Sequence, residues 1–160
     1  MKEEIISIET VVSKMLIEKN LTISIAESCT GGLVSATLIN YPGISSVFME
    51  GCVTYSNESK INRLGVNPNT LKVYGAVSEE TAREMAEGIA KNFDTNVAIS
   101  TTGIAGPDGG SDIKPVGLVY IGIYYQGKAV VTKQLFQGDR AVIRERSTKA
   151  ALRLLWETLK

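Results

Sequence analysis

The 160-residue sequence contains no histidine, two cysteines and a single tryptophan. Without histidine, a serine or cysteine nucleophile must be activated by another base, such as lysine, a carboxylate, tyrosine or the N-terminus. Cys29 and Cys52 form neither a CxxC pair nor a zinc cluster, so they indicate the reduced thiols of a cytoplasmic protein. We expect no metal site, because the only close acidic pair outside the expected helices is Asp108 with Asp112, which is typical of a solvated loop.

Net charge, long apolar runs and a leader are missing as well. Seventeen basic residues balance seventeen acidic ones without a Lys/Arg-rich run, which argues against nucleic-acid binding. No stretch approaches the roughly 20 apolar residues of a membrane span. Met1 to Ile6 carries two acidic residues and does not resemble a signal peptide. We therefore expect a cytoplasmic protein without a nucleic-acid or membrane partner.

Helical and strand patterns alternate along the chain. We expect helices at 3–19 and 33–39, a helix at 57–64 with Ser56 and Asn57 as capping candidates, and two further helices capped by Ser78 and Asp139. The helix after Ser78 carries a buried stripe of Ala82, Met85, Ala86 and Ile89. Strands are expected at 21–26, 48–55, 96–100, 116–125 and 128–136. The last two strands form a hairpin through a turn that contains glycine. The pattern predicts one α/β domain over residues 1–160, a three-layer α/β/α fold with a mixed, mostly parallel sheet closed by the C-terminal hairpin. Function is then expected in the loops at the strand ends.

The first candidate site is the turn that follows the strand at 21–26. Ser28 lies where the strand gives way to a helix, and the backbone N–H groups of Thr30, Gly31 and Gly32 could form an oxyanion hole beside it. Ser28 would then be the nucleophile. An alternative interpretation is that Ser28 or Thr30 merely caps the helix.

The second candidate is the pair Tyr55 and Lys60, at the end of a strand and one turn into the next helix. Lysine is one of the bases that can replace histidine beside a serine. At its usual pKa only about 0.04% of a lysine is neutral at pH 7, and lowering the pKa to about 7 costs roughly 4–5 kcal/mol. Tyr55 could relay the proton or orient the lysine. The alternative is an ordinary solvated helix lysine.

The third candidate is the glycine-rich loop that follows the strand at 96–100. Two hydroxyls and a flexible backbone could bind phosphate through Thr101, Thr102, Gly103, Ala105 and Gly106. The loop is neither a Walker A motif nor a dinucleotide fingerprint. The alternative is that its glycines only build turns.

The fourth candidate is a pair of arginines in the last helix. Arg140 and Arg144 are four residues apart on one face, near the helix start where anions are preferred. Two cations there favour an anionic ligand such as phosphate. Pairing of the arginines with Asp139 or Glu145 is the alternative.

Together these segments resemble one family, the C-terminal domain of the competence/damage-inducible protein CinA, which also occurs as stand-alone nicotinamide-nucleotide amidases (PncC, NMN deamidase). The resemblance covers nearly the whole chain. The matching stretches read AESCTGG at 26–32, YPGISSVF at 41–48, YSNESK at 55–60, LGV at 64–66, GAVS at 75–78, TGIAGP at 102–107 and KPVG at 114–117.

The resemblance implies hydrolysis of the carboxamide of nicotinamide mononucleotide to nicotinate mononucleotide and ammonia. It implies Ser28 as the nucleophile, Lys60 as the general base and Tyr55 as its helper. The positions that resemble ligand contacts are Ser45, Thr102, Gly103 and Arg140. It further implies a homo-oligomer that uses no metal or organic cofactor.

Two other functions remain open at this point. One is a regulatory module that binds a pyridine nucleotide or phosphate without turnover, for which a paired Ser28 and Lys60 would have no purpose. The other is an enzyme with Cys29 as nucleophile, which is disfavoured because no imidazole is present to activate the thiol.

Overall fold

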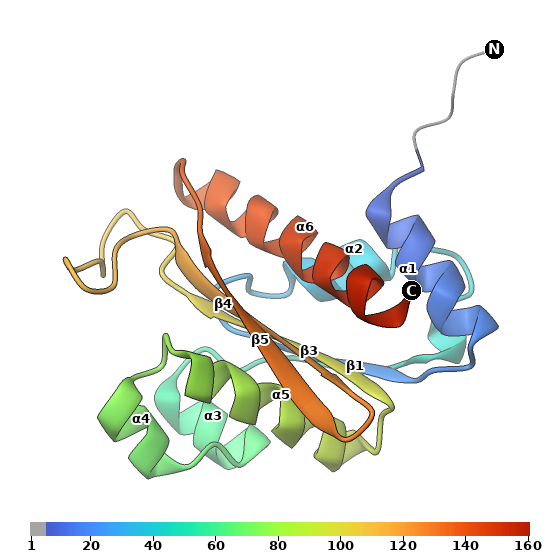
Figure 1. The fold of residues 1–160 in the computed structure, drawn as a ribbon, viewed down its shortest axis with the longest axis horizontal. Coiled ribbons are helices and arrows are strands. Elements are labelled where there is room, and N and C mark those ends of the chain that lie inside the picture. The colour runs from blue at the N-terminus through green and yellow to red at the C-terminus, as the bar shows by residue number, and fades with distance from the viewer. Residues whose placement is uncertain (1–5) are drawn as a thin grey trace.

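The computed structural model describes residues 6–160. The strands are β1 (Ile23–Glu27), β2 (Phe48–Val53), β3 (Val97–Gly103), β4 (Leu118–Tyr125) and β5 (Lys128–Leu135). The helices are α1 (Ile8–Glu18), α2 (Leu33–Leu38), the short 3-10 helix η1 (Ile44–Ser46), α3 (Asn57–Leu64), α4 (Pro68–Tyr74), α5 (Glu79–Phe93) and α6 (Arg140–Leu159). Figure 1 follows these elements from the N-terminus to the C-terminus.

The strands form one mixed sheet in the order β2-β1-β3-β4-β5. The strands β2, β1 and β3 are parallel, whereas β4 and β5 add to β3 as an antiparallel hairpin. Glu27, the last residue of β1, pairs with Val53 on one side and with Thr101 on the other. The loops that leave β1, β2 and β3 therefore start at the same edge of the sheet, where a site in such folds is expected.

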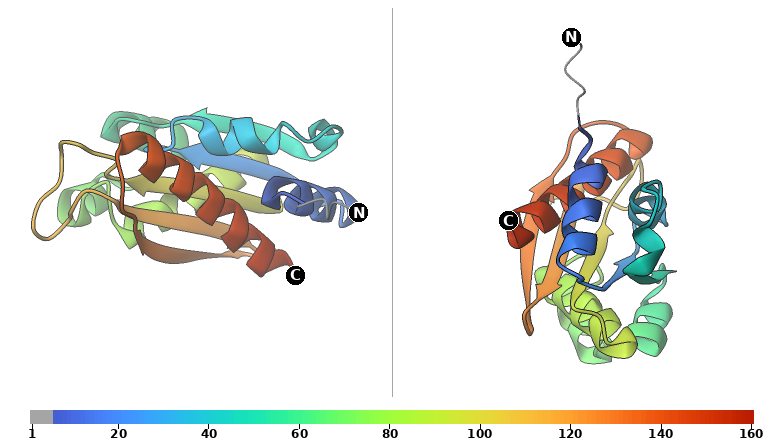
Figure 2. Two further views of the ribbon diagram at one scale, coloured as in Figure 1. Left: turned by 90° about the horizontal axis from the view of Figure 1, so that it is seen from above. Right: turned by 90° about the vertical axis from the view of Figure 1, so that its right-hand side faces the viewer.

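Helices cover both faces of the sheet and confirm the predicted three-layer fold. In Figure 1, α1, α2 and α6 lie above the sheet and α3, α4 and α5 lie below it, and the side view in Figure 2 separates the same layers. Neighbouring strand residues face opposite layers. Ile25 packs into the cluster that contains Leu16 and Leu155, whereas Ala26 packs into the cluster around Met85 and Ile89.

Hydroxyl and carboxylate side chains begin three helices, as the sequence predicts. Ser56, Ser78 and Asp139 accept hydrogen bonds from backbone N–H groups three residues later, at 3.0, 3.2 and 2.9 Å. These bonds satisfy donors that the first helical turn leaves free. The cap at Ser56 matters most here, because it fixes the start of the helix that carries Lys60.

The sequence prediction differs from the structure at several boundaries. The short helix α4 was not expected, although Asn67 caps it and Pro68 occupies its first turn. The strand β3 runs to Gly103, so it takes in three residues that were assigned to a loop. The first residues of the helix expected at 3–19 lie outside the described part of the chain. Between residues 6 and 160, no helix has the length and apolar character that a membrane crossing requires.

Candidate functional site

The turn after β1 brings Ser28 to the carboxyl edge of the sheet. The Ser28 N–H donates to the Thr101 carbonyl at 3.0 Å, which extends the pairing of β1 with β3 by one residue. Gly31 and Gly32 then follow with φ of +58° and +101°, a region that glycine enters without strain. The side chain of Ser28 is 8% exposed. The glycines thus reverse the chain within a few residues of a nearly buried hydroxyl.

Lys60 projects from the first turn of α3 into the same place. Its Nζ donates to Ser28 Oγ at 3.1 Å and to the carbonyls of Thr54 and Tyr55 at 2.9 and 3.1 Å. The residue is only 1% exposed, so the interpretation as a solvated helix lysine is wrong. The two carbonyls fix the Nζ position, and the serine hydroxyl is its third partner.

Burial sets the protonation of this lysine. Desolvation lowers the pKa of Lys60 from its ordinary value of 10.5, because the charged form loses its hydration. Neither of the two salt bridges within residues 6–160 involves Lys60. The side chain is therefore suited to accept a proton from a hydroxyl that it already touches.

Tyr55 takes part through its backbone more directly than through its ring. Its carbonyl accepts from Lys60, whereas its phenol oxygen accepts from Arg140 Nη2 at 3.1 Å. The side chain is 60% exposed. The structure thus pairs the phenol with the arginine at the mouth of the site, and a proton-relay role for the ring stays a prediction.

A buried carboxylate that the sequence pattern did not single out organises the turn. Glu27 is 1% exposed and accepts from the N–H groups of Val34 and Ser35 and from the hydroxyls of Thr30 and Ser35, at 2.6 to 3.0 Å. It therefore caps α2 from the end of β1. The interpretation of Ser28 or Thr30 as the helix cap is wrong, because Thr30 donates to Glu27 and Ser28 contacts Lys60. A lone acid at the end of the strand pattern at 21–26 was the available signal.

The three backbone donors proposed for an oxyanion differ in this arrangement. The Gly31 N–H donates to the Ser28 carbonyl at 3.1 Å and so closes the turn. The N–H groups of Thr30 and Gly32 have no acceptor within residues 6–160. Thr30 and Gly32 remain candidate donors, while the Gly31 amide is already engaged.

Most of the residues at the end of β3 that were predicted to bind substrate form contacts within the protein. The Thr101 hydroxyl lies 2.7 Å from the Thr30 hydroxyl, and the Thr102 hydroxyl donates to the Ala76 carbonyl at 2.7 Å. A Cβ at Gly103 would lie 2.8 Å from the Leu118 carbonyl, so close approach of β4 requires glycine there. Contacts of these residues with a ligand stay predictions.

Two further loop residues lie where the loop meets α6. Ala105 is buried, and the Gly106 carbonyl accepts from Arg140 Nη1 at 2.8 Å. A cavity of about 480 Å³ opens beside them and is lined by Ala105, Pro107, Val116, Gly138, Asp139, Arg140 and Ala141. Its volume is typical of small-molecule sites. The loop and Arg140 therefore border a space that could accept part of a ligand.

Ser45 does not join this cluster. It lies in η1, before the amino end of β2, whereas Tyr55 and Lys60 follow the carboxyl end of the same strand. Six strand residues, about 20 Å of chain, separate the two ends. The sequence match at this position thus marks a segment that the fold of one chain does not bring to Ser28.

The two arginines bind backbone carbonyls, and neither forms a salt bridge with any residue between 6 and 160. Arg140 donates to Gly106 and to the Tyr55 phenol, while Arg144 donates to the carbonyls of Cys29 and Thr30. Pairing with Asp139 or Glu145 is wrong, because Asp139 caps α6 and Glu145 binds Lys149. Arg140 is exposed beside the cavity and can still meet an anion, whereas the guanidinium of Arg144 already holds the serine turn.

Cys29 is poorly suited to act as the nucleophile. It is 6% exposed, and burial raises the pKa of its thiol to about 12. A thiol with that pKa is not ionised near neutral pH. The structure therefore argues for the hydroxyl of Ser28 over the neighbouring thiol.

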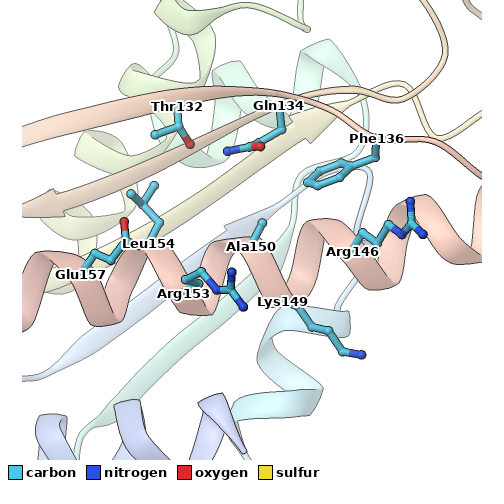
Figure 3. A pocket seen from close by; sticks show the side chains of 9 residues that line it. All are labelled: Thr132, Gln134, Phe136, Arg146, Lys149, Ala150, Arg153, Leu154 and Glu157. Carbon is cyan, nitrogen blue, oxygen red and sulfur yellow. The ribbon is translucent and has the colours of Figure 1, made fainter.

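A second hollow of about 420 Å³ lies between β5 and α6 (Figure 3). It is rimmed by three cations, but two of them have partners: Arg146 donates to the Gln137 carbonyl, and Lys149 pairs with Glu145. Figure 3 shows Lys149 extending away from the strand. None of the residues that line this hollow comes from the turn or from α3, and none hydrogen-bonds to Ser28, Tyr55 or Lys60, whereas Arg140 beside the cavity of about 480 Å³ bonds to the Tyr55 phenol. The hollow is therefore separate from the chemistry of Ser28.

Comparisons with known proteins give a consistent result. The sequence model of the CinA C-terminal domain family matches residues 5–159 of this chain. A competence-damage inducible protein of Clostridioides difficile is 65% identical over 146 residues, which cover 91% of this chain and 35% of that protein. Its counterpart in Clostridium beijerinckii is 64% identical over 152 residues, covering 95% and 37%. The chain thus spans about a third of the length of these relatives.

Solved structures agree over the whole fold. A CinA superfamily protein from Klebsiella pneumoniae superimposes with a TM-score of 0.92 at 35% identity and covers 95% of each chain. The competence/damage inducible protein CihA from Agrobacterium tumefaciens gives a TM-score of 0.90 at 37% identity over 100% of both chains.

Proposed function

The chain belongs to the CinA C-terminal domain family, and from this premise we propose that it is an amidase that hydrolyses the carboxamide of nicotinamide mononucleotide. The observation that carries the proposal is the buried contact of 3.1 Å between Lys60 Nζ and Ser28 Oγ. A lysine with a lowered pKa beside a serine is the arrangement that nucleophilic catalysis needs when histidine is absent.

The first half of the reaction forms an acyl-enzyme. Neutral Lys60 accepts the hydroxyl proton while Ser28 Oγ bonds to the carboxamide carbon. The carbonyl oxygen becomes an anion, which the Thr30 and Gly32 N–H groups can stabilise. The carbon–nitrogen bond then breaks, and ammonia leaves with the proton that Lys60 held.

The second half returns the enzyme to its starting state. A water molecule gives one proton to Lys60 and bonds to the acyl carbon through its oxygen. The ester bond to Ser28 breaks, Lys60 returns the proton to the serine oxygen, and nicotinate mononucleotide is released. The sum is amide plus water to carboxylic acid plus ammonia, which at neutral pH are present as carboxylate and ammonium, and no other reactant is required.

The choice of a nucleotide substrate rests on the family resemblance and on one further feature. Arg140 lies at the mouth of the site, bonded to the Tyr55 phenol and beside the cavity of about 480 Å³. A guanidinium there is suited to a phosphate. The resemblance also implies a homo-oligomer, and sedimentation of the purified chain would test its self-association. The two free cysteines fit a cytoplasmic location.

The test is the release of ammonia from nicotinamide mononucleotide by the purified chain. We expect Ser28→Ala and Lys60→Met to abolish turnover, while two exposed controls, Ser46→Ala and Lys72→Met, keep it. If both active-site variants keep full activity, the Ser-Lys mechanism is wrong. If Cys29→Ala is inactive and Ser28→Ala active, the thiol is the nucleophile.

Calorimetry with the same nucleotide distinguishes the regulatory alternative. A wild-type chain that binds nicotinamide mononucleotide but releases no ammonia would be a binding module, and the amidase proposal would fall. We expect binding and turnover together.

A further inference from the structure

The guanidinium of Arg144 donates hydrogen bonds to two neighbouring carbonyls of the turn that carries Ser28. Arg144, on α6, donates from Nε to the Cys29 carbonyl at 3.1 Å and from Nη2 to the Thr30 carbonyl at 2.9 Å. A Cβ at Gly31 would lie 3.1 Å from the same Nη2, so the arginine lies directly against the turn. The planar fork of arginine can bridge two acceptors in a fixed geometry, which a lysine cannot do.

These bonds determine where the amides of the turn point. In a trans peptide the C=O and the N–H face opposite directions. Because Arg144 holds the Cys29 carbonyl, the Thr30 N–H points away from the guanidinium. Because it also holds the Thr30 carbonyl, the Gly31 N–H points away too and closes the turn on Ser28. The Thr30 amide is thereby left as an oriented donor with no acceptor among residues 6–160.

The charge of Arg144 acts at the same place. Arg144 is part-buried and takes part in neither salt bridge of the described residues, so no carboxylate neutralises it there. A cation beside the carbonyl oxygen of a peptide group polarises that group and makes its N–H hydrogen more positive. Two independent effects, orientation and charge, therefore favour an anion at the Thr30 amide.

We propose that Arg144 is a positioning residue for acylation of Ser28, which it assists by holding the backbone of the turn that carries Ser28 and the unbonded amides of Thr30 and Gly32. The inference rests on the proposed function and adds a residue that touches neither the substrate nor Ser28 Oγ. Arg146 provides the matched control, because it lies on the same helix and also donates to a backbone carbonyl, that of Gln137, at 2.7 Å.

The test measures how fast Ser28 is labelled by a fluorophosphonate, alongside the steady-state kinetics of ammonia release. We expect Arg144→Met and Arg144→Lys to slow labelling about tenfold to a hundredfold, because losing one oriented oxyanion donor has effects of that order or more. We expect kcat to fall by a similar factor with KM within about twofold, because ground-state binding is not involved. Arg146→Met should match wild type in both measurements.

A purely structural Arg144 gives a different result. If folded Arg144→Lys and Arg144→Met label Ser28 at the wild-type rate, or if KM rises while kcat is unchanged, the inference is overturned. Arg144→Lys keeps the charge and most of the side-chain volume, so it provides a folded variant if Arg144→Met is unstable. Thermal unfolding of each variant confirms that the comparison is made on folded protein.

The two proposals fail in distinguishable ways. If Ser28 of the wild-type chain is labelled but no ammonia is released from the nucleotide, the proposed substrate is wrong. The labelling rates alone then decide whether Arg144 has the positioning role. A chain that hydrolyses the nucleotide equally well with and without Arg144 refutes only the positioning role. A chain that neither labels nor hydrolyses refutes both.

Discussion

Lys60 Nζ lies 3.1 Å from Ser28 Oγ, although 32 positions separate the two residues in the sequence. The contact exists because β1 and β2 are parallel neighbours, so the loops after them leave the sheet at one edge. Each residue alone has an ordinary explanation. The contact between the two residues, both nearly buried, is the feature that indicates a chemical role.

The pH dependence of turnover follows from the buried amine. Since the neutral amine is the base and burial lowers its pKa, the rate of Ser28 labelling should rise with pH through a midpoint below 10.5. Lys60→Arg stays protonated and should lose about 10²- to 10⁴-fold in rate, with Lys72→Arg as the exposed control. A midpoint near 10.5, or an active Lys60→Arg variant, would contradict the assignment.

Stability should change with pH for the same reason. The unfolded chain holds the Lys60 proton up to the ordinary pKa of 10.5, whereas the folded chain releases it at a lower pH. Between these two values unfolding takes up a proton, so the free energy of unfolding rises with pH, by at most about 1.4 kcal/mol per pH unit. Below this window the buried charge destabilises the fold.

Urea unfolding of wild type and Lys60→Met at a series of pH values tests this. We expect wild type to gain stability relative to Lys60→Met as pH rises through the window, because the variant has no proton to exchange. A constant difference across the series would mean that Lys60 titrates normally.

Glu27 should be required for the fold of the turn. In Glu27→Gln an amide NH₂ replaces one acceptor oxygen and meets donors from α2, such as the Ser35 N–H. Loss of a bond to a charged group in the interior should cost about 1.5–3 kcal/mol of unfolding free energy. Glu50→Gln, on the edge strand β2, should change it by less than about 0.5 kcal/mol. Equal stability of the two variants would contradict the capping role.

The sequence predicts the fold well because its signals are local. Capping by Ser56, Ser78 and Asp139 and the buried stripe of α5 depend on neighbours a few residues away, and the structure confirms them. The helix α4 was missed because seven residues give too short a pattern to recognise.

The site was predictable only in part, because its contacts are long-range. Local spacing left Ser28 open as a helix cap and Lys60 as a surface residue, and only the resemblance linked them. Glu27 and Arg144 act on backbone atoms, and a sequence does not reveal which carbonyl or amide a side chain will meet. The anion-binding interpretation of the arginines thus fits Arg140 at the mouth but misses the inward contacts of Arg144.

Arg140 gives a test of the substrate that is independent of the catalytic pair. If its guanidinium binds the phosphate, Arg140→Met should raise KM for nicotinamide mononucleotide about tenfold to a hundredfold with little change in kcat, since a hydrogen bond to a charged group is worth about 1.5–3 kcal/mol. Nicotinamide riboside lacks the phosphate, so its kinetics should not change. Arg146→Met serves as the control. If KM rises equally for both substrates, Arg140 acts by holding the Gly106 loop, to whose carbonyl it also donates at 2.8 Å. The phosphate must then bind elsewhere.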